Sequence, residues 1–397
     1  MIINPPSIKP FHNSTLIKSI NIPTRYYNGP EICSLYNVPI VKALPYNKVI
    51  KQVKIAIIVA FTYPDIKADL QTYWQSDINY GSNSTPPNIT VYTWAGATQN
   101  AEWAQEECLD VQMVCAINPN ADIYVVEAKS SFLNDMLNAV DYAVNVINAD
   151  ILSMSWGVND MSLLNIYKKH FTNSSKCYCA ASGDSNIVSW PSVVSSCISV
   201  GGTSLEWSPT IEKPFNRKEY TWTSSGSGYS LSNMLPKYQN KLKDMIPKGK
   251  NGLDIKNPKR FIPDVSLIAN PSTGVYGVYA GNWYVFGGTS VSTAMFSAIL
   301  SIANQKRFNI GKKALTTVYS ELAPLSNNIQ NYLYKTVYTN EIKYRSNFYD
   351  VIIGTNVGTN PSGGSSTYNT LTGYDIPTGL GSPNCKQFCA DLSNGIL

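Results

Sequence analysis

The segment KIAIIVAF at residues 54–61 constrains the fold more than any other part of the chain. It is almost wholly apolar and rich in β-branched residues, which is typical of a strand buried on both faces of a parallel sheet. We expect further strands at 89–94, 122–128, 151–156 and 176–182, and helices at 66–74, 101–117, 131–147 and between the last two strands. Strands that alternate with helices build a parallel sheet covered on both faces, so we expect an α/β fold.

The second half of the chain is less regular. Residues from about 203 to 285 are rich in Gly, Ser, Pro and Tyr, which predicts loops and short antiparallel strands, and a helix of small residues is predicted at 289–305. A chain of 397 residues, 44% of them hydrophobic, can bury a large core. Without a repeat or a clear linker, we expect a single domain over residues 26–397, preceded by an extended arm over residues 1–25.

Composition argues against several classes of partner. The net charge of +5 comes without a dense Lys/Arg run, so nucleic acid is not expected as a partner. No apolar run reaches the length of a membrane span, and the N-terminal residues lack the apolar core of a signal peptide, so the compartment stays undetermined. Eight cysteines without a CxxC pair, and only two histidines, argue against a zinc site and leave disulfide pairing open.

One serine stands where a glycine turn opens into a predicted helix. In GGTSVSTA (287–294) the glycines permit close backbone approach to Ser290, and the helix N-terminus favours negative charge that develops nearby. An ordinary N-cap serine is the simpler alternative.

A catalytic serine needs a base, yet His12 lies in the arm and His170 lies in YKKHF, and both are predicted at the surface. A Ser-His-Asp triad would therefore lack its histidine.

Carboxylates can take the place of that histidine. Glu106 and Asp110 in AEWAQEECLDVQMV (101–114) are four residues apart and share one helix face. If buried together they would share a proton, whereas the alternative is a solvated acidic face.

Asp184 in ASGDSN (181–186) follows a predicted strand and would face a crevice at the end of the sheet. A protonated Asp184 can donate a hydrogen bond to an oxyanion, and the alternative is an Asx turn.

Together and in this order, the motifs resemble those of the sedolisin family of serine-carboxyl peptidases. Residues 106–110 match E-x-x-L-D, residues 182–184 match S-G-D, and residues 287–292 match S-G-T-S-x-S with Gly287 in place of the first serine. The resemblance implies a subtilisin-like three-layer sandwich with a central, mostly parallel sheet. It also implies Glu106 as base, Asp110 as its partner, Asp184 as oxyanion donor and Ser290 as nucleophile.

The resemblance extends over most of residues 30–385. It includes LYNVP (35–39), SMSWG (153–157), VGGTSL (200–205), SGSGYS (225–230) and RFIPDVSLIANPSTGVYGVY (260–279). It implies that Ser155, Trp156 and Gly157 pair with an extended substrate, a peptide or an unfolded protein. We expect the protein to act as a monomer.

Two C-terminal segments, FYDVIIGTN (348–356) and LTGYDIPTGLGSP (371–383), resemble the family's calcium site. The implied ligands of one structural Ca²⁺, in loops spanning about 348–381, are Asp350, Val351, Leu371, Gly373 and Asp375. The aspartates would supply carboxylates and the other three residues main-chain carbonyls, which suits an oxygen-seeking ion. The alternative is a pair of turn aspartates in a glycine-rich loop.

Two departures from the family pattern affect the predicted function. Members usually carry a long propeptide, whereas only about 25 residues precede the recognisable domain and no propeptide domain is recognised. Val59 and Ala60 stand where many relatives have a glutamate, so we expect activity at mildly acid to neutral pH. The predicted function is a serine-carboxyl endopeptidase that acts through an acyl-enzyme. The alternative is a catalytically silent sedolisin-like binding or structural protein.

Overall fold

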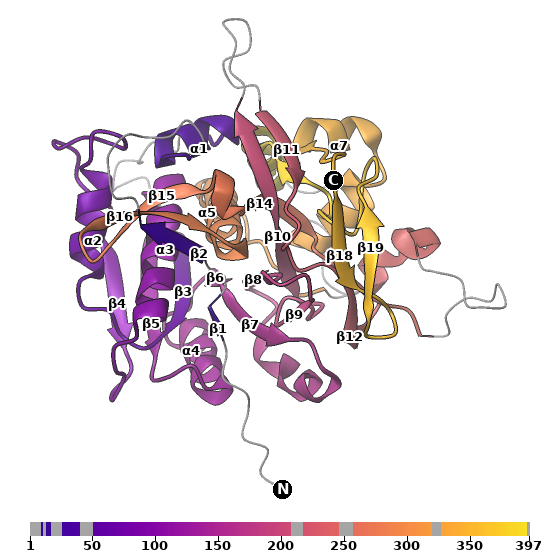
Figure 1. The fold of residues 1–397 in the computed structure, drawn as a ribbon, viewed down its shortest axis with the longest axis horizontal. Coiled ribbons are helices and arrows are strands. Elements are labelled where there is room, and N and C mark those ends of the chain that lie inside the picture. Colours follow the sequence, from indigo (N-terminus) through magenta and orange to yellow (C-terminus); the bar gives the residue numbers. More distant parts are fainter. Residues whose placement is uncertain are drawn as a thin grey trace, which may run out of the picture.

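A computed structural model describes residues 9–10, 13–16, 26–39, 51–207, 217–245, 257–319 and 327–394. Its largest sheet has the order β11-β10-β8-β6-β3-β5-β4, with β14 also paired to β10 (Figure 1). These strands are β3 (Lys54–Ala60), β4 (Ile89–Thr93), β5 (Asp122–Ala128), β6 (Ile151–Met154), β8 (Cys177–Ala181), β10 (Cys197–Trp207), β11 (Arg217–Thr221) and β14 (Val265–Ile268). Only β11 pairs antiparallel, so the predicted central, mostly parallel sheet is confirmed.

The predicted helices flank this sheet. They are α2 (Ile66–Trp74), α3 (Ala101–Ile117), α4 (Leu133–Asn145) and α5 (Thr289–Asn309), with α1 (Gly29–Leu35) and α8 (Cys385–Asn394) beside them. Helix α3 packs against α5 and both contact β3, whereas α4 contacts β3 and β5. Helix α5 is buried on all sides for most of its length. Many of its side chains are small, so the neighbouring elements pack closely against it.

Smaller sheets and short helices lie around the central sheet. Their strands are β1 (Lys9–Pro10), β2 (Asn13–Leu16), β7 (Trp156–Asn159), β9 (Ser189–Trp190), β12 (Gly228–Met234), β13 (Lys259–Ile262), β15 (Val275–Tyr279), β16 (Asn282–Gly287), β17 (Phe348–Tyr349), β18 (Thr355–Thr359), β19 (Ser365–Asn369) and β20 (Ser382–Pro383). The helical turns are η2 (Ser162–Phe171), η3 (Lys237–Met245), η4 (Pro271–Thr273), α6 (Ile329–Asn331), η6 (Tyr332–Val337) and α7 (Glu341–Asn347).

Two expectations about the sequence between 156 and 285 need correction. The helix that precedes β8 is the 3₁₀ helix η2, and its His170 is not a freely exposed residue. The His170 side chain is 17% exposed, and its Nδ1 lies 2.9 Å from Asp141 Oδ2 on α4. The region expected to hold only loops and antiparallel strands also supplies β14, which pairs parallel with β10. His12 lies outside the described residues.

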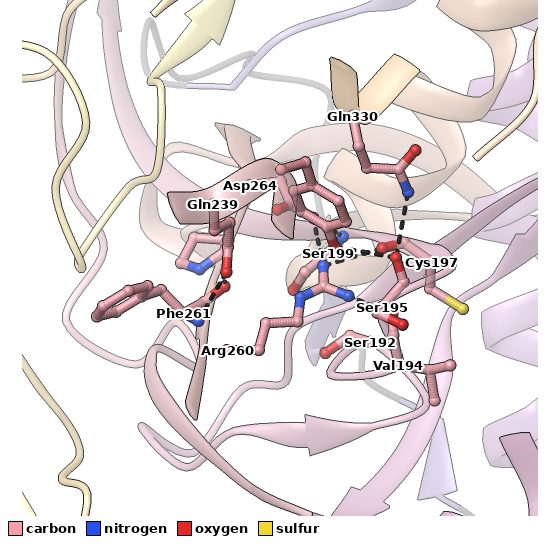
Figure 2. Close-up of polar contacts among 12 residues, drawn as sticks. Ser192, Val194, Ser195, Cys197, Ser199, Gln239, Arg260, Phe261, Asp264 and Gln330 are labelled. Carbon is pink, nitrogen blue, oxygen red and sulfur yellow. Dashed lines mark hydrogen bonds and ion pairs between the residues drawn. The ribbon is translucent and has the colours of Figure 1, made fainter. Parts of the chain in front are cut away.

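A buried ion pair holds β13 and β14 against the end of β10 (Figure 2). Arg260 Nη2 lies 2.6 Å from Asp264 Oδ2, and both side chains are fully buried. The same nitrogen donates to Cys197 O at 2.9 Å, and Asp264 Oδ2 accepts the Ser199 N–H at 2.7 Å. Nearby, Tyr334 donates to Asp264 Oδ1 at 2.5 Å. Arginine and aspartate are tolerated here because each charge has hydrogen-bond partners as well as its counter-ion.

All eight cysteines lie within the described residues, and none of them forms a disulfide bond. Over that same part of the chain, the helices are too short or too polar to cross a bilayer.

Candidate active site

Ser290 is the second residue of α5 and is fully buried. The N-cap of the helix is Gly288, so the simpler interpretation of Ser290 as an N-cap is wrong. Gly288 has φ +106°, a conformation that favours glycine. A Cβ on Gly287 would lie 2.5 Å from Pro271 Cα, so the turn has no space for the serine found at this position in the family motif.

The two acids on α3 are both fully buried, which excludes a solvated acidic helix face. Burial raises the pKa of Asp110 well above its usual range, and the nearby Glu106 carboxyl raises it further. A hydrogen bond from Ser155 acts in the opposite direction. The raised pKa of Asp110 favours the protonated form of its carboxyl group beside Glu106.

Ser155 connects the acids to the nucleophile position. It directly follows β6, at the carboxyl end of the parallel sheet, where crevices form in such folds. Its hydroxyl donates to Asp110 Oδ1 at 2.7 Å, and its carbonyl accepts a hydrogen bond from Ser290 Oγ at 3.3 Å. The family resemblance assigned Ser155 a main-chain role towards substrate. Its side-chain bond to Asp110 was not predicted, because the SMSWG motif does not show which way the hydroxyl points.

The other two residues of the predicted substrate edge lie in β7. Trp156 is fully buried, and its indole N–H donates to Ile58 O at 2.9 Å. This bond anchors the start of β7 to β3, so the tryptophan positions the strand edge. Gly157 follows in the same strand.

Asp184 lies beyond the end of β8 and caps the helix that carries Ser290. Its Oδ1 accepts the Thr289 N–H at 2.8 Å and the Thr289 hydroxyl at 2.7 Å. Gly183 N–H donates to the same hydroxyl at 3.2 Å. These contacts connect positions 105 residues apart, so Asp184 does more than stabilise its own turn. They hold its carboxyl group beside the first turn of α5.

A second pair of buried carboxyl groups adjoins the first and was not predicted. Glu107 and Glu127 are 1% and 0% exposed. Burial, followed by the charge and hydrogen bond of Glu127, raises the pKa of Glu107 well above its usual range. Glu127 also accepts the Tyr63 N–H at 2.8 Å and the Thr93 hydroxyl at 2.5 Å. The raised pKa of Glu107 favours the protonated form of its carboxyl group beside Glu127. A lone glutamate in the apolar strand DIYVVEA was the sequence signal for this pair.

Oxygen atoms converge at the predicted calcium loops. The Tyr344 hydroxyl lies 2.8 Å from Asp350 Oδ1, 3.2 Å from Gly373 O and 3.1 Å from Leu380 O. One hydroxyl has one proton and donates to one acceptor at a time. Three acceptors around a single donor are a set of oxygens that fits a hard cation such as Ca²⁺.

The second aspartate of these loops is deeply buried. Asp375 accepts the Thr378 N–H at 2.8 Å and the Leu371 N–H at 3.1 Å. Burial is the main reason that its pKa is raised to about 7. Val351, the remaining predicted ligand, is buried next to Asp350 in the chain. Among the described residues, no group of three or more His, Cys, Asp and Glu side chains gathers as a metal cluster. Any site here would therefore depend on main-chain oxygens.

Comparison with known proteins agrees with this architecture. Residues 89–350 match the model of the subtilase family. Kumamolisin of Bacillus sp. (strain MN-32) is 28% identical over 302 residues, which is 69% of this chain and 48% of kumamolisin. Sedolisin of Pseudomonas sp. (strain 101) is 26% identical over 227 residues, which is 54% of this chain and 32% of sedolisin. The chain thus spans half or less of the length of these two relatives.

Among solved structures, Pseudomonas sedolisin, a serine-carboxyl proteinase complexed with two molecules of pseudo-iodotyrostatin, has the same fold. The two superpose with a TM-score of 0.71 over 94% of this chain and 99% of the sedolisin chain, at 20% identity.

Proposed function

Because this chain belongs to the subtilase family and, within it, to the sedolisin group, we propose that it is a serine-carboxyl endopeptidase. The observation that supports this most directly is the buried path of hydrogen bonds from Asp110 through Ser155 to Ser290. Ser155 thereby connects Asp110 to a serine hydroxyl at a helix N-terminus. A nucleophile, a carboxyl group and a helix N-terminus are among the groups that acyl transfer needs.

In the proposed mechanism, Glu106 is the general base. It accepts the proton of Ser290 Oγ as that oxygen attacks the scissile carbonyl carbon. Asp110 retains the proton shared by the pair and orients Glu106, and Ser155 holds Asp110 in place. The C–N bond breaks as the amine leaves with the proton, and water then hydrolyses the acyl-enzyme. The substrate is a peptide or an unfolded protein.

Asp184 stabilises the oxyanion of the tetrahedral intermediate in this proposal. Its Oδ1 is held by Thr289, so a proton on the carboxyl group would be directed from a fixed position. A neutral carboxyl donor beside a helix N-terminus provides electrostatic stabilisation without reorganisation during the reaction.

The working pH follows from the carboxyl pair. The elevated pKa of Asp110, which burial causes first and Glu106 second, favours the half-protonated pair in acid. Strand β3 supplies no further acid at Val59 or Ala60. We therefore propose activity from acid to neutral pH, with hydrolysis lost when the pair gives up its last proton.

We also propose one structural Ca²⁺ at the loops of Asp350 and Asp375. The oxygens around the Tyr344 hydroxyl support it, because this side chain alone cannot satisfy all of them. When bound, the ion would neutralise two carboxylates and hold the loops together. It takes no part in bond cleavage.

Hydrolysis of a denatured protein between strong acid and neutral pH tests the function. We would compare the wild type with Ser290→Ala and Glu106→Gln, and use Glu102→Gln, an exposed position on the same helix, as the control. Loss of hydrolysis in the first two variants alone is the expected result. Hydrolysis that survives Ser290→Ala would exclude the assigned nucleophile. A folded but inactive wild type would favour the catalytically silent alternative.

A further inference from the structure

A cavity of about 620 Å³ lies at the amino ends of β3, β6 and β8, three neighbouring strands of the central sheet. Its wall includes Asp150, which immediately precedes β6, and Lys176, which immediately precedes β8. The last turn of α5 and the segment that follows it complete the wall. Phe308 of this wall and Ser290 lie on the same helix, about 27 Å apart along its axis. The cavity is therefore separate from the candidate active site.

The wall of this cavity carries an excess of positive charge. Its charged residues are four lysines and one carboxylate, namely Lys51, Lys176, Lys312, Lys313 and Asp150. The carboxylate is already engaged, because Asp150 Oδ1 lies 2.5 Å from Lys51 Nζ and its Oδ2 accepts the Lys54 N–H at 3.0 Å. Within the described part of the chain, Lys51 alone of the four lysines forms an ion pair. Three lysines of the wall thus have no carboxylate partner there.

Lys176 is the most deeply buried of these lysines, with only 3% of its surface exposed. Its Nζ donates to the side-chain oxygen of Asn148, which is a neutral amide. Burial lowers the pKa of Lys176, Asp150 acts in the opposite direction, and Lys51 lowers the pKa further. Lysines are almost never fully buried unless they are paired, because a charge in a dry site needs a counter-charge. An anion bound in this cavity would supply that counter-charge.

Helix ends account for part of the basic charge, but not for all of it. Lys312 Nζ donates to Asn394 O at 2.5 Å and to Ser393 O at 3.3 Å, so it neutralises the carboxyl end of α8. The carboxyl ends of α5 and α8 each carry about half a negative charge, and together they offset about one of the three lysines. About two positive charges then remain for a ligand, which favours an anion with at least two negative charges.

We propose that this cavity binds a small anion of the diphosphate class, held by Lys176, Lys312 and Lys313. Lysine ammonium groups bind phosphate oxygens as compact point charges. The cavity is in the range of small-molecule sites, about 300–1,000 Å³, and has space for more than one phosphoryl group. The bound anion would connect the start of β8 to the segment after α5, and so stabilise the folded protein. This proposal does not depend on the proposed peptidase function.

Calorimetric titration with inorganic pyrophosphate tests the site, in the full chain with Ser290→Ala to prevent self-digestion. The protein is first freed of Ca²⁺ and dialysed, because pyrophosphate also binds that ion. We expect one site per chain, with a Kd that rises as NaCl is added. Lys313→Ala, at an exposed position, should raise the Kd about tenfold through the loss of one charge-assisted hydrogen bond. Lys67→Ala, at an exposed position on α2, is the matched control and should leave the Kd unchanged. Equal Kd values for the two variants would overturn the proposal.

Thermal unfolding of Lys176→Met tests the role of the buried charge. Without pyrophosphate, this variant should melt at or above the temperature of its parent chain, because an apolar side chain replaces a buried charge that lacks a carboxylate partner. Pyrophosphate should raise the melting temperature of the parent and not that of the variant. An equal rise in both would refute the site, as would an equal rise of the parent with sulfate at the same ionic strength, which is a general salt effect. If Lys176→Met does not fold, the titration of Lys313→Ala still decides.

A diphosphate group has two sources, the inorganic ion and a nucleotide, and a titration with ADP distinguishes them. Tighter binding of ADP than of pyrophosphate would assign the cavity to a nucleotide. Equal or weaker binding of ADP would assign it to the inorganic ion. If the folded protein binds neither, the cavity is not a diphosphate site.

Discussion

Replacing Arg260 with Met should destabilise the fold far more than the same change at Arg345. The chain offers this matched comparison because both arginines pair with a carboxylate four positions away, at 2.6 Å for Asp264 and 2.8 Å for Glu341. The first pair is fully buried, whereas the side chains of the second are 70% and 75% exposed.

The expected magnitude follows from this difference in burial. Removing one partner of a buried pair leaves an uncompensated charge, at a cost of about 3–5 kcal/mol, whereas exposed pairs contribute about 0–1 kcal/mol. Arg260→Met also removes the donor to Cys197 O. Burial already raises the pKa of Asp264, and Arg260 lowers it, so the pKa rises further in the variant. The loss should therefore shrink in acid, where Asp264 is protonated in the folded protein.

Urea unfolding monitored by tryptophan fluorescence measures both variants, in a Ser290→Ala background that prevents self-digestion. Adding Asp264→Asn to Arg260→Met should recover part of the loss, because it removes the unpaired charge. Equal losses for Arg260→Met and Arg345→Met, or a loss at Arg260 that does not change with pH, would refute the reasoning.

Three further predictions concern the carboxyl groups. Glu107→Gln should reduce the fall in stability above about pH 4. The pKa of Glu107 is raised in the folded protein, so wild-type stability declines as pH rises from the glutamate pKa of the unfolded chain towards the pKa of the folded protein. Melting temperatures measured across pH test this, and parallel curves for the two proteins would contradict it. Ser155→Ala should shift the alkaline limb of the pH–activity profile up by about 1–2 pH units. The Ser155 hydroxyl lowers the pKa of Asp110 through a hydrogen bond worth about 1.5–3 kcal/mol, and the variant loses that bond. An unshifted limb would show that Asp110 does not set this limb. Calcium should raise the melting temperature of the wild type but not of Asp375→Asn, and equal shifts would exclude this site.

Local patterns were sufficient for much of the fold. Apolar runs predicted β3, β5 and β8, of which β3 and β5 are also rich in β-branched residues, because a strand buried on both faces has a composition that is visible within a short segment. Likewise, spacing alone placed Glu106 and Asp110 on one helix face, and glycines indicated the turn before Ser290. The family resemblance then ordered these signals into one candidate site.

Other features depended on contacts between residues far apart in the chain. Spacing did not show whether the acid pair was buried, and the burial of both residues comes from the packing of α3 against α5 and the sheet. The bond from Ser155 to Asp110 spans 45 positions. The Pro271 backbone that leaves Gly287 no space for a side chain is likewise remote in sequence.

The sequence by itself determined the α/β alternation, the helix face of the acids and the glycine turn, because each depends on residues within a few positions of one another. The tertiary structure decided the burial of the two carboxyl pairs, the parallel pairing of β14, and the pairing of β1 with β7 and of β2 with β16. The physical reason is that a strand's own residues do not specify its partner. Pairing and desolvation are set by which distant segments compete for the same edge and the same core.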